Sequence, residues 1–155
     1  MSDTKEVVVA LVRRVTIKKI LDLRHRVLRA GMPLESARFD GDEDPSTWHV
    51  AVFVSEAPCA PPVCCASFVR AWFTQQEAWQ LRGMATDPAV QRSGFGAQLL
   101  DWAMPNIVAE SGTRLFWCNA RLPAIRFYEK QGWECVSPSF KIEGVGEHRQ
   151  MQKIL

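Results

Sequence analysis

Residues 84–103 read MATDPAVQRSGFGAQLLDWA, and this stretch changes character halfway along. It begins as the end of an apolar strand, passes through Asp87-Pro88, and reaches Gln91–Gly96, a segment with two glycines. A helical pattern of apolar residues follows. The start of a helix leaves backbone N–H groups without partners, and glycine lets an anion approach them closely. The segment is therefore either a tight turn with Ser93 as the helix N-cap or a backbone site for a phosphate.

Two common phosphate motifs do not fit this segment. A P-loop requires Gly-Lys-Ser/Thr after four intervening residues, and the lysine is missing. A dinucleotide-binding fingerprint requires a glycine three residues after Gly96, where Leu99 stands. A ligand at this segment would therefore carry a phosphate of another type.

The composition predicts one globular domain that spans residues 1–155. Hydrophobic residues make up 47% and charged residues 23%, and the net charge of +2 is not gathered into a basic tail for nucleic acid. The sequence shows no secretory signal and no apolar run of membrane-spanning length, so we expect a cytoplasmic protein that binds neither membrane nor nucleic acid.

The cysteines and histidines do not predict a metal site. No C-x-x-C pair is present, and the three histidines are scattered. The five cysteines are expected to be reduced thiols, those within apolar runs acting as small hydrophobic residues. They are Cys59, Cys64, Cys65, Cys118 and Cys135.

The hydrophobic pattern predicts alternating strands and helices. Strands are expected at residues 6–11, 48–54, 63–73, 78–86, 115–118, 140–142 and 148–154. Helices are expected from the N-cap Thr16 to Gly31, at 94–110 and at 122–130. Residues 48–73 read as an antiparallel pair, and the crossover through the glycine segment makes the strands before and after it parallel. Because Pro105 lies within the second helix, we expect a kink or break between Trp102 and Asn106.

Two segments carry a resemblance to a known family. Gln91–Gly96 resembles the Q/R-x-x-G-x-G/A motif of the GNAT acyltransferase superfamily, and it lies between a strand and a long helix as in that family. Downstream, ARLPAIRFYEKQGWE (residues 120–134) resembles the family's A-x-x-F-Y-E-x-x-G-F segment. The resemblance implies an α/β (α+β) fold with a central mixed sheet of about six to seven strands flanked by helices. A splayed parallel pair of strands would hold the cofactor.

The resemblance also implies the cofactor, acetyl-CoA. Its pyrophosphate would bind the N–H groups of Arg92–Gly96, and its pantetheine arm would pair with Met84–Thr86 like an added strand. Ser93 stands where a glycine is common, and Arg121 stands where many members have asparagine, with Asn119 two residues earlier. The cofactor-binding residues implied are Met84, Ala85, Thr86, Gln91, Arg92, Ser93, Gly94, Phe95, Gly96, Asn119, Arg121, Ala124 and Phe127.

Acetyl transfer to an amine needs an oxyanion donor, a proton for the leaving thiolate and a proton acceptor. Tyr128 matches the family tyrosine that donates to the thiolate, and the oxyanion donor would be a backbone N–H near Ala85. The family's usual carboxylate position holds Gln80, which cannot accept a proton. Glu77 is a second candidate, although strand alternation places it on the opposite face. Further alternatives are a chain of water molecules and the three histidines: His25, His49 and His148.

The loop at residues 39–45 is acidic, with Asp40, Asp42, Glu43 and Asp44. In the family this region often borders the acceptor site, where acids would attract a cationic amine. The alternative is a solvated loop without a binding role.

The sequence thus predicts an acyl-CoA N-acyltransferase. It would move an acetyl group from acetyl-CoA to a primary amine of a small molecule or peptide, by direct attack through a tetrahedral intermediate. A homodimer is one option for its assembly. The alternative is a non-catalytic acetyl-CoA-binding sensor or interaction module, which the glutamine at position 80 favours and the retained Tyr128 disfavours.

Overall fold

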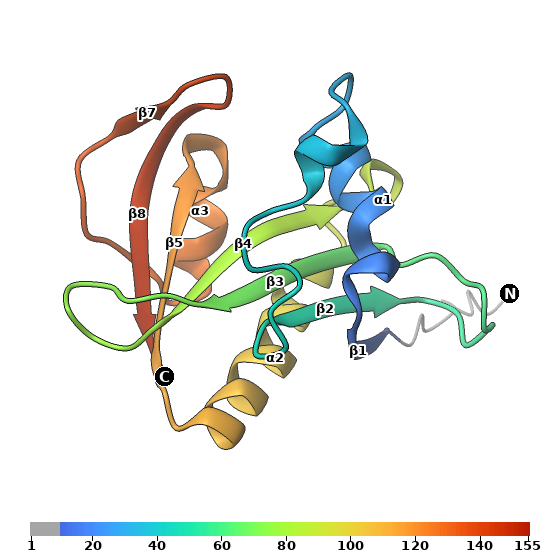
Figure 1. Cartoon of the computed structure of the whole chain (residues 1–155), viewed down its shortest axis with the longest axis horizontal. Helices are drawn as coiled ribbons and strands as arrows, with labels where there is room; N and C mark the ends of the chain where they lie inside the picture. The colour runs from blue at the N-terminus through green and yellow to red at the C-terminus, as the bar shows by residue number, and fades with distance from the viewer. Residues whose placement is uncertain (1–9) are drawn as a thin grey trace, which may run out of the picture.

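The computed structural model describes residues 10–155, and it contains one eight-stranded sheet (Figure 1). The strand order is β1-β2-β3-β4-β5-β8-β6, with β7 paired to β8 outside this path. The strands are β1 (Leu11–Val15), β2 (Trp48–Phe53), β3 (Cys64–Arg70), β4 (Trp79–Thr86), β5 (Leu115–Arg121), β6 (Glu134–Cys135), β7 (Phe140–Ile142) and β8 (Gly146–Ile154). The mixed fold with a parallel pair is confirmed, and the short strand β7 lies where the sequence predicts it, whereas the two-residue strand β6 is not predicted.

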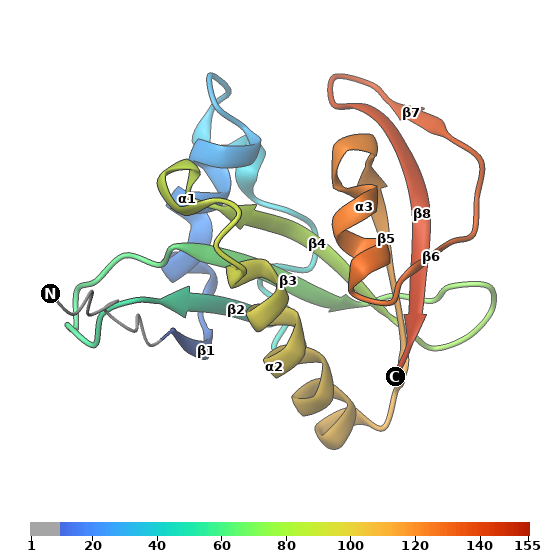
Figure 2. The same cartoon turned by 180° about the vertical axis from the view of Figure 1, so that it is seen from behind.

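Helices cover both faces of the sheet. Helix α1 (Ile17–Leu28) lies on one face, and α2 (Phe95–Ser111) with α3 (Ile125–Lys130) lies on the other (Figures 1 and 2). Short 3-10 turns are η1 (Leu34–Ala37), η2 (Pro88–Val90) and η3 (Leu122–Ala124). No helix among residues 10–155 combines the length and the apolar character needed to cross a bilayer.

Strand alternation divides the core between these two faces. On β2, Val50 and Val52 face the α2 side, whereas Ala51 and Phe53 face α1. All six residues of β2 are buried, so both faces of this strand lie in the interior, and His49 is its one polar residue. The antiparallel pairing predicted for β2 and β3 is confirmed.

The first predicted strand, residues 6–11, lies almost wholly outside the described residues. The structure describes a strand at Leu11–Val15 instead, which runs antiparallel to β2. Helix α1 begins after Thr16 as predicted, although no hydrogen bond from the Thr16 side chain caps it.

Helix α2 departs from the sequence expectation at two places. Its N-cap is Gly94 in a left-handed conformation, not Ser93. The helix also continues unbroken through Pro105 to Ser111, so the expected break is wrong, and the alternative of a kink there stays a prediction. Asp101 and Pro105 are both exposed, so water can hydrate the Asp101 carbonyl that Pro105 leaves without an N–H partner.

Candidate active site

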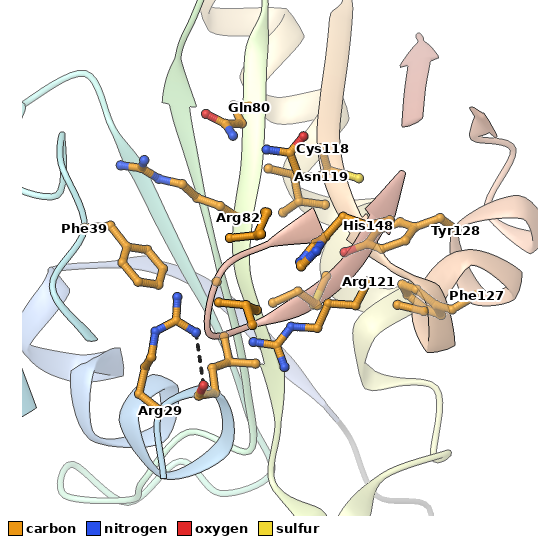
Figure 3. Close-up of a pocket in the computed structure, with 18 of the residues that line it drawn as sticks. Arg29, Phe39, Gln80, Arg82, Cys118, Asn119, Arg121, Phe127, Tyr128 and His148 are labelled. Carbon is orange, nitrogen blue, oxygen red and sulfur yellow. Dashed lines mark hydrogen bonds between the residues drawn. The ribbon is translucent and has the colours of Figure 1, made fainter. Parts of the chain in front are cut away.

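The parallel strands β4 and β5 separate after only two paired positions. Trp79 pairs with Phe116 and Gln80 with Trp117, and no further pairs follow along these two strands. A cavity of about 570 Å³ lies in the gap, between Gln80–Met84 and Cys118–Arg121 (Figure 3). The predicted splay of the parallel pair is therefore present.

A bulge in β4 shapes the wall of this cavity. The pairing of β3 with β4 shifts between Cys65 and Ser67, which oppose Ala85 and Arg82. Gly83 lies in the bulge with φ +67, and a Cβ there would lie 2.9 Å from Nε of Arg24. Strand alternation is therefore interrupted at Arg82–Met84, and these residues belong to the unbroken run Gln80–Met84 that lines the cavity.

The glycine segment forms an exposed row of backbone donors at the start of α2. Gly94 has φ +84 and Arg92 has φ +66, and a Cβ on Gly94 would meet nothing within 4 Å. The first helical bond runs from the Gln98 N–H to the Gly94 carbonyl. The N–H groups of residues 92–97 donate to no acceptor among the described residues.

Gly96 serves a different purpose from Gly94. A Cβ at Gly96 would lie 3.1 Å from Cζ of Phe127 and 3.9 Å from Sδ of Met84. The missing side chain therefore lets α3 pack closely against the start of α2. Because Met84 and Phe127 also line the cavity, they connect the row of donors with it.

Tyr128 lies on α3 and points into the cavity toward His148 (Figure 3). Its ring contacts those of Phe127 and Trp133 edge to face, with centroids 5.1 and 5.4 Å away. Burial raises the pKa of Tyr128, so the phenol is a proton donor and not a phenolate at neutral pH. Cys118 also lines the cavity, and burial raises the pKa of its thiol to about 12, so it is not a nucleophile.

The structure separates the candidate proton acceptors. Gln80 lines the cavity, but Glu77 is exposed in the β3–β4 connection and lines a different, smaller hollow. His25 contacts the Met32 carbonyl on the surface. Burial of His49 lowers its pKa, and the ring lies within the fold outside the cavity.

His148 is the histidine that the structure brings to the cavity. It is 3% exposed, and Nδ1 lies 2.8 Å from the Gly146 carbonyl oxygen. Because a carbonyl only accepts, Nδ1 carries the proton in the neutral ring and Nε2 carries the lone pair. The sequence offered His148 only as one of three histidines, since its position depends on the pairing of β8 with β5, which sets it opposite Arg121.

The acidic loop is mostly engaged within the protein. Asp42 is buried and pairs with the fully buried Arg24 at 2.7 Å, while Glu43 lies near Arg38. Asp44 accepts from Ser46. Of the four acids, only Asp40 lines the cavity, so the loop does not present the acidic surface for a cationic amine that the sequence suggested.

Buried polar atoms without partners mark where a ligand would be complementary. Oδ1 of Asn119 is buried in the cavity wall and accepts no hydrogen bond from residues 10–155. Among the implied cofactor residues, five line the cavity, whereas Ala85, Thr86 and residues 91–96 lie beyond it. The five are Met84, Asn119, Arg121, Ala124 and Phe127.

Comparison with known proteins agrees with this architecture. A family profile described as "Acetyltransferase (GNAT) domain" matches residues 45–147. An uncharacterised N-acetyltransferase of Bacillus subtilis (strain 168), YitI, is 31% identical over 152 residues, covering 93% of this chain and 95% of that protein.

Solved structures show the same fold. Escherichia coli ElaA superposes with a TM-score of 0.72 at 13% identity, covering 95% of this chain and 99% of that one. An aminoglycoside 6'-N-acetyltransferase complexed with coenzyme A superposes with a TM-score of 0.70 at 13% identity, covering 93% and 96%. Since the family profile spans most of the chain and a relative matches nearly all of it, the chain belongs to the GNAT acetyltransferase family.

Proposed function

We propose that the protein transfers an acetyl group from acetyl-CoA to a primary amine. The observation that carries this proposal is the continuity of two features. The row of free N–H groups at residues 92–97 leads, past Met84 and Phe127, into the cavity between β4 and β5. A long ligand with a phosphate at one end and a reactive group at the other matches this shape. The coenzyme A bound in the aminoglycoside acetyltransferase of similar fold supports the assignment.

The residues fit coenzyme A along its length. The pyrophosphate would lie on the N–H groups of residues 92–96, where the helix dipole also favours an anion. The pantetheine arm would follow the edge of β4 at Met84–Thr86, which has no ladder partner on β5. The unpartnered Oδ1 of Asn119 would accept a hydrogen bond from an amide of the arm.

The side chains of the cavity would supply the proton transfers. His148 would take the proton of the amine through Nε2, since its other nitrogen is held by the Gly146 carbonyl. Tyr128 would donate a hydrogen bond to the departing thiolate, and a backbone N–H near Ala85 would stabilise the oxyanion. Neither Gln80 nor Glu77 is assigned a proton-accepting role, because the first is an amide and the second lies outside the cavity.

The cofactor site is tested by a matched pair of variants at Gly94. Gly94→Asp places a carboxylate against the pyrophosphate, whereas Gly94→Asn places a neutral side chain of the same shape there. Both residues tolerate a left-handed backbone better than most others. Calorimetry should show acetyl-CoA binding lost in the Asp variant and largely retained in the Asn variant. If the folded Gly94→Asp variant binds acetyl-CoA as tightly as the unsubstituted protein does, the pyrophosphate does not bind at this segment.

A non-catalytic acetyl-CoA-binding module is the second candidate, and Gln80 at the usual carboxylate position favours it. The two candidates differ in turnover. A panel of primary amines, assayed for release of coenzyme A, distinguishes them, since a binding module would acetylate no amine while binding acetyl-CoA.

A further inference from the structure

Positively charged side chains outnumber negatively charged ones in the lining of the cavity. Four arginines line it, Arg29, Arg38, Arg82 and Arg121, against one carboxylate, that of Asp40. Arg29 follows the last turn of α1, and Arg121 ends β5 on the opposite wall. Their guanidinium groups point into the same part of the cavity (Figure 3).

Arg29 and Arg121 differ from Arg24 and Arg38 in their partners. Arg24 pairs with Asp42, and Arg38 lies near Glu35 and Glu43. No ion pair found among residues 10–155 includes Arg29, Arg121 or Arg82. Burial lowers the pKa of Arg82, but the nearby carboxylates of Asp42 and Asp40 partly balance its charge. Nη1 of Arg29 donates to the Leu28 carbonyl, which is neutral. Burial and then the charge of Arg121 lower the pKa of Arg29, as expected where no anion balances the two cations.

Phe39 holds Arg29 in place without neutralising it. Cζ of Arg29 lies 5.3 Å from the centroid of the Phe39 ring, and Cζ of Arg24 lies 4.2 Å from the same centroid. Phe39 also donates its backbone N–H to the buried Asp42 carboxylate at 2.7 Å. The guanidinium of Arg29 is thus positioned before any ligand arrives, which favours tight binding of a planar anion.

We propose that the acetyl acceptor is an amine that also carries a carboxylate, and that Arg29 and Arg121 bind this carboxylate. The inference rests on the proposed acetyl transfer and names its substrate class. The amine would point toward His148 and Tyr128, and the carboxylate toward the end of α1. Two guanidinium groups bind a carboxylate through charge-assisted hydrogen bonds and repel a polycationic amine. The acceptor class is therefore amino-acid-like.

Matched substrates test the class directly. Amino acids are compared with their carboxamides, which keep the amine and lose the α-carboxylate, and spermidine serves as a polycation. The α-amides of aspartic and glutamic acid keep only a side-chain carboxylate. They therefore show whether the arginines bind the α-carboxylate or a side-chain carboxylate. We expect kcat/KM to be about 10- to 100-fold higher for acceptors with a carboxylate, the size of one or two charge-assisted bonds.

Equal or higher kcat/KM for simple carboxamides or spermidine would overturn the inference and leave acetyl transfer intact. If no amine reacts while acetyl-CoA binds, the inference falls together with the proposed reaction.

Variants test the residues. Arg29→Gln and Arg121→Gln should each lower kcat/KM for the carboxylate acceptor about 10-fold or more, and change it little for the matching carboxamide. Arg26→Gln is the control, because Arg26 lies on the same helix, is exposed and does not line the cavity. The proposal replaces the cofactor contact that the family resemblance implies for Arg121, so calorimetry should give the same acetyl-CoA affinity for all three variants. A loss of acetyl-CoA affinity in the Arg29 or Arg121 variant would assign that arginine to the cofactor and overturn the pair.

Discussion

The phenol of Tyr128 keeps its proton at neutral pH, since the ring is buried among aromatic side chains and burial raises its pKa. Tyr128→Phe keeps these ring contacts and removes only the hydroxyl. We expect kcat to fall about 10- to 100-fold, because the hydroxyl would act on the leaving thiolate. Acetyl-CoA affinity and melting temperature should change little. Turnover at the rate of the original enzyme would reduce the tyrosine to a packing role.

Single residues differ in how far the sequence could assign them. Tyr128 and Gly94 lie in local motifs, so their places follow from a few neighbours in the chain. His148 could not be selected among the histidines, because its position depends on the register of β8 against β5. The sequence does not mark Arg29 as a site residue, because only the folded chain places the end of α1 opposite Arg121. Their roles, like that of Tyr128, stay predictions.

At the scale of elements, Pro105 within α2 gives a prediction of stability. Pro105→Ala restores a backbone N–H for the Asp101 carbonyl and removes the clash of the proline ring with it. The gain is partly offset by the greater freedom that alanine gives the unfolded chain. We expect a net stabilisation of about 1–2 kcal/mol by urea unfolding. As a control, the exposed Asp101→Ala should change stability by less than about 0.5 kcal/mol. A destabilised alanine variant would show that Pro105 is accommodated without cost.

The unbroken α2 also shows where local patterns fail. Proline in a helix interior predicts a break, but five buried side chains anchor the helix to the sheet on both sides of it. They are Leu99, Leu100, Ala103, Met104 and Ile107. Packing of this face outweighs the local penalty. The bulge at Gly83 could likewise not be predicted from the sequence, because a bulge depends on the register of β4 against β3.

At the scale of the whole molecule, His49 connects distant elements. Nε2 of His49 lies 2.9 Å from the Asp42 carbonyl oxygen and Nδ1 lies 2.7 Å from the Ser67 hydroxyl, which also accepts from Arg24. The network thus joins α1, the acidic loop, β2 and β3. Its members all lie in the interior, so a charge added there acts on the stability of the whole fold.

The network predicts a pH dependence of folding. Burial lowers the pKa of His49 below the ordinary 6.5, so the unfolded chain binds the proton more tightly than the folded chain does. The stabilisation is complete above that value and is lost as the pH falls through the window below it. His49→Gln should therefore flatten the fall in unfolding free energy between about pH 7 and 5, by at most about 1.4 kcal/mol per pH unit. The unfolding free energy of each protein is measured by urea titration at several pH values. If it falls equally with pH in the His49→Gln variant and in the unsubstituted protein, His49 is not the cause of the pH dependence.

The overall fold was largely predictable because the two family motifs lie on either side of β5 and fix the order of the elements between them. Strand periodicity and the crossover then imply the parallel pair, which the structure confirms. The division of acidic side chains between cavity and interior was not predictable, because Asp42 and Asp40 look alike in the sequence and differ only in what surrounds them. A cytoplasmic location and a homodimer stay predictions.

The unequal burial of the cysteines has a consequence at the bench. Cys59 and Cys135 are exposed, whereas Cys64, Cys65 and Cys118 are buried, with pKa values raised by burial to about 11, about 12 and about 12. The proposed reaction liberates coenzyme A, whose sulfhydryl is commonly followed with a colorimetric reagent. The enzyme therefore contributes its own signal to such an assay, first from the two exposed groups and later from the three buried ones. A slow second rise in colour would therefore indicate that protein is unfolding. A control reaction without acceptor thus measures the fraction of unfolded enzyme as well as the background.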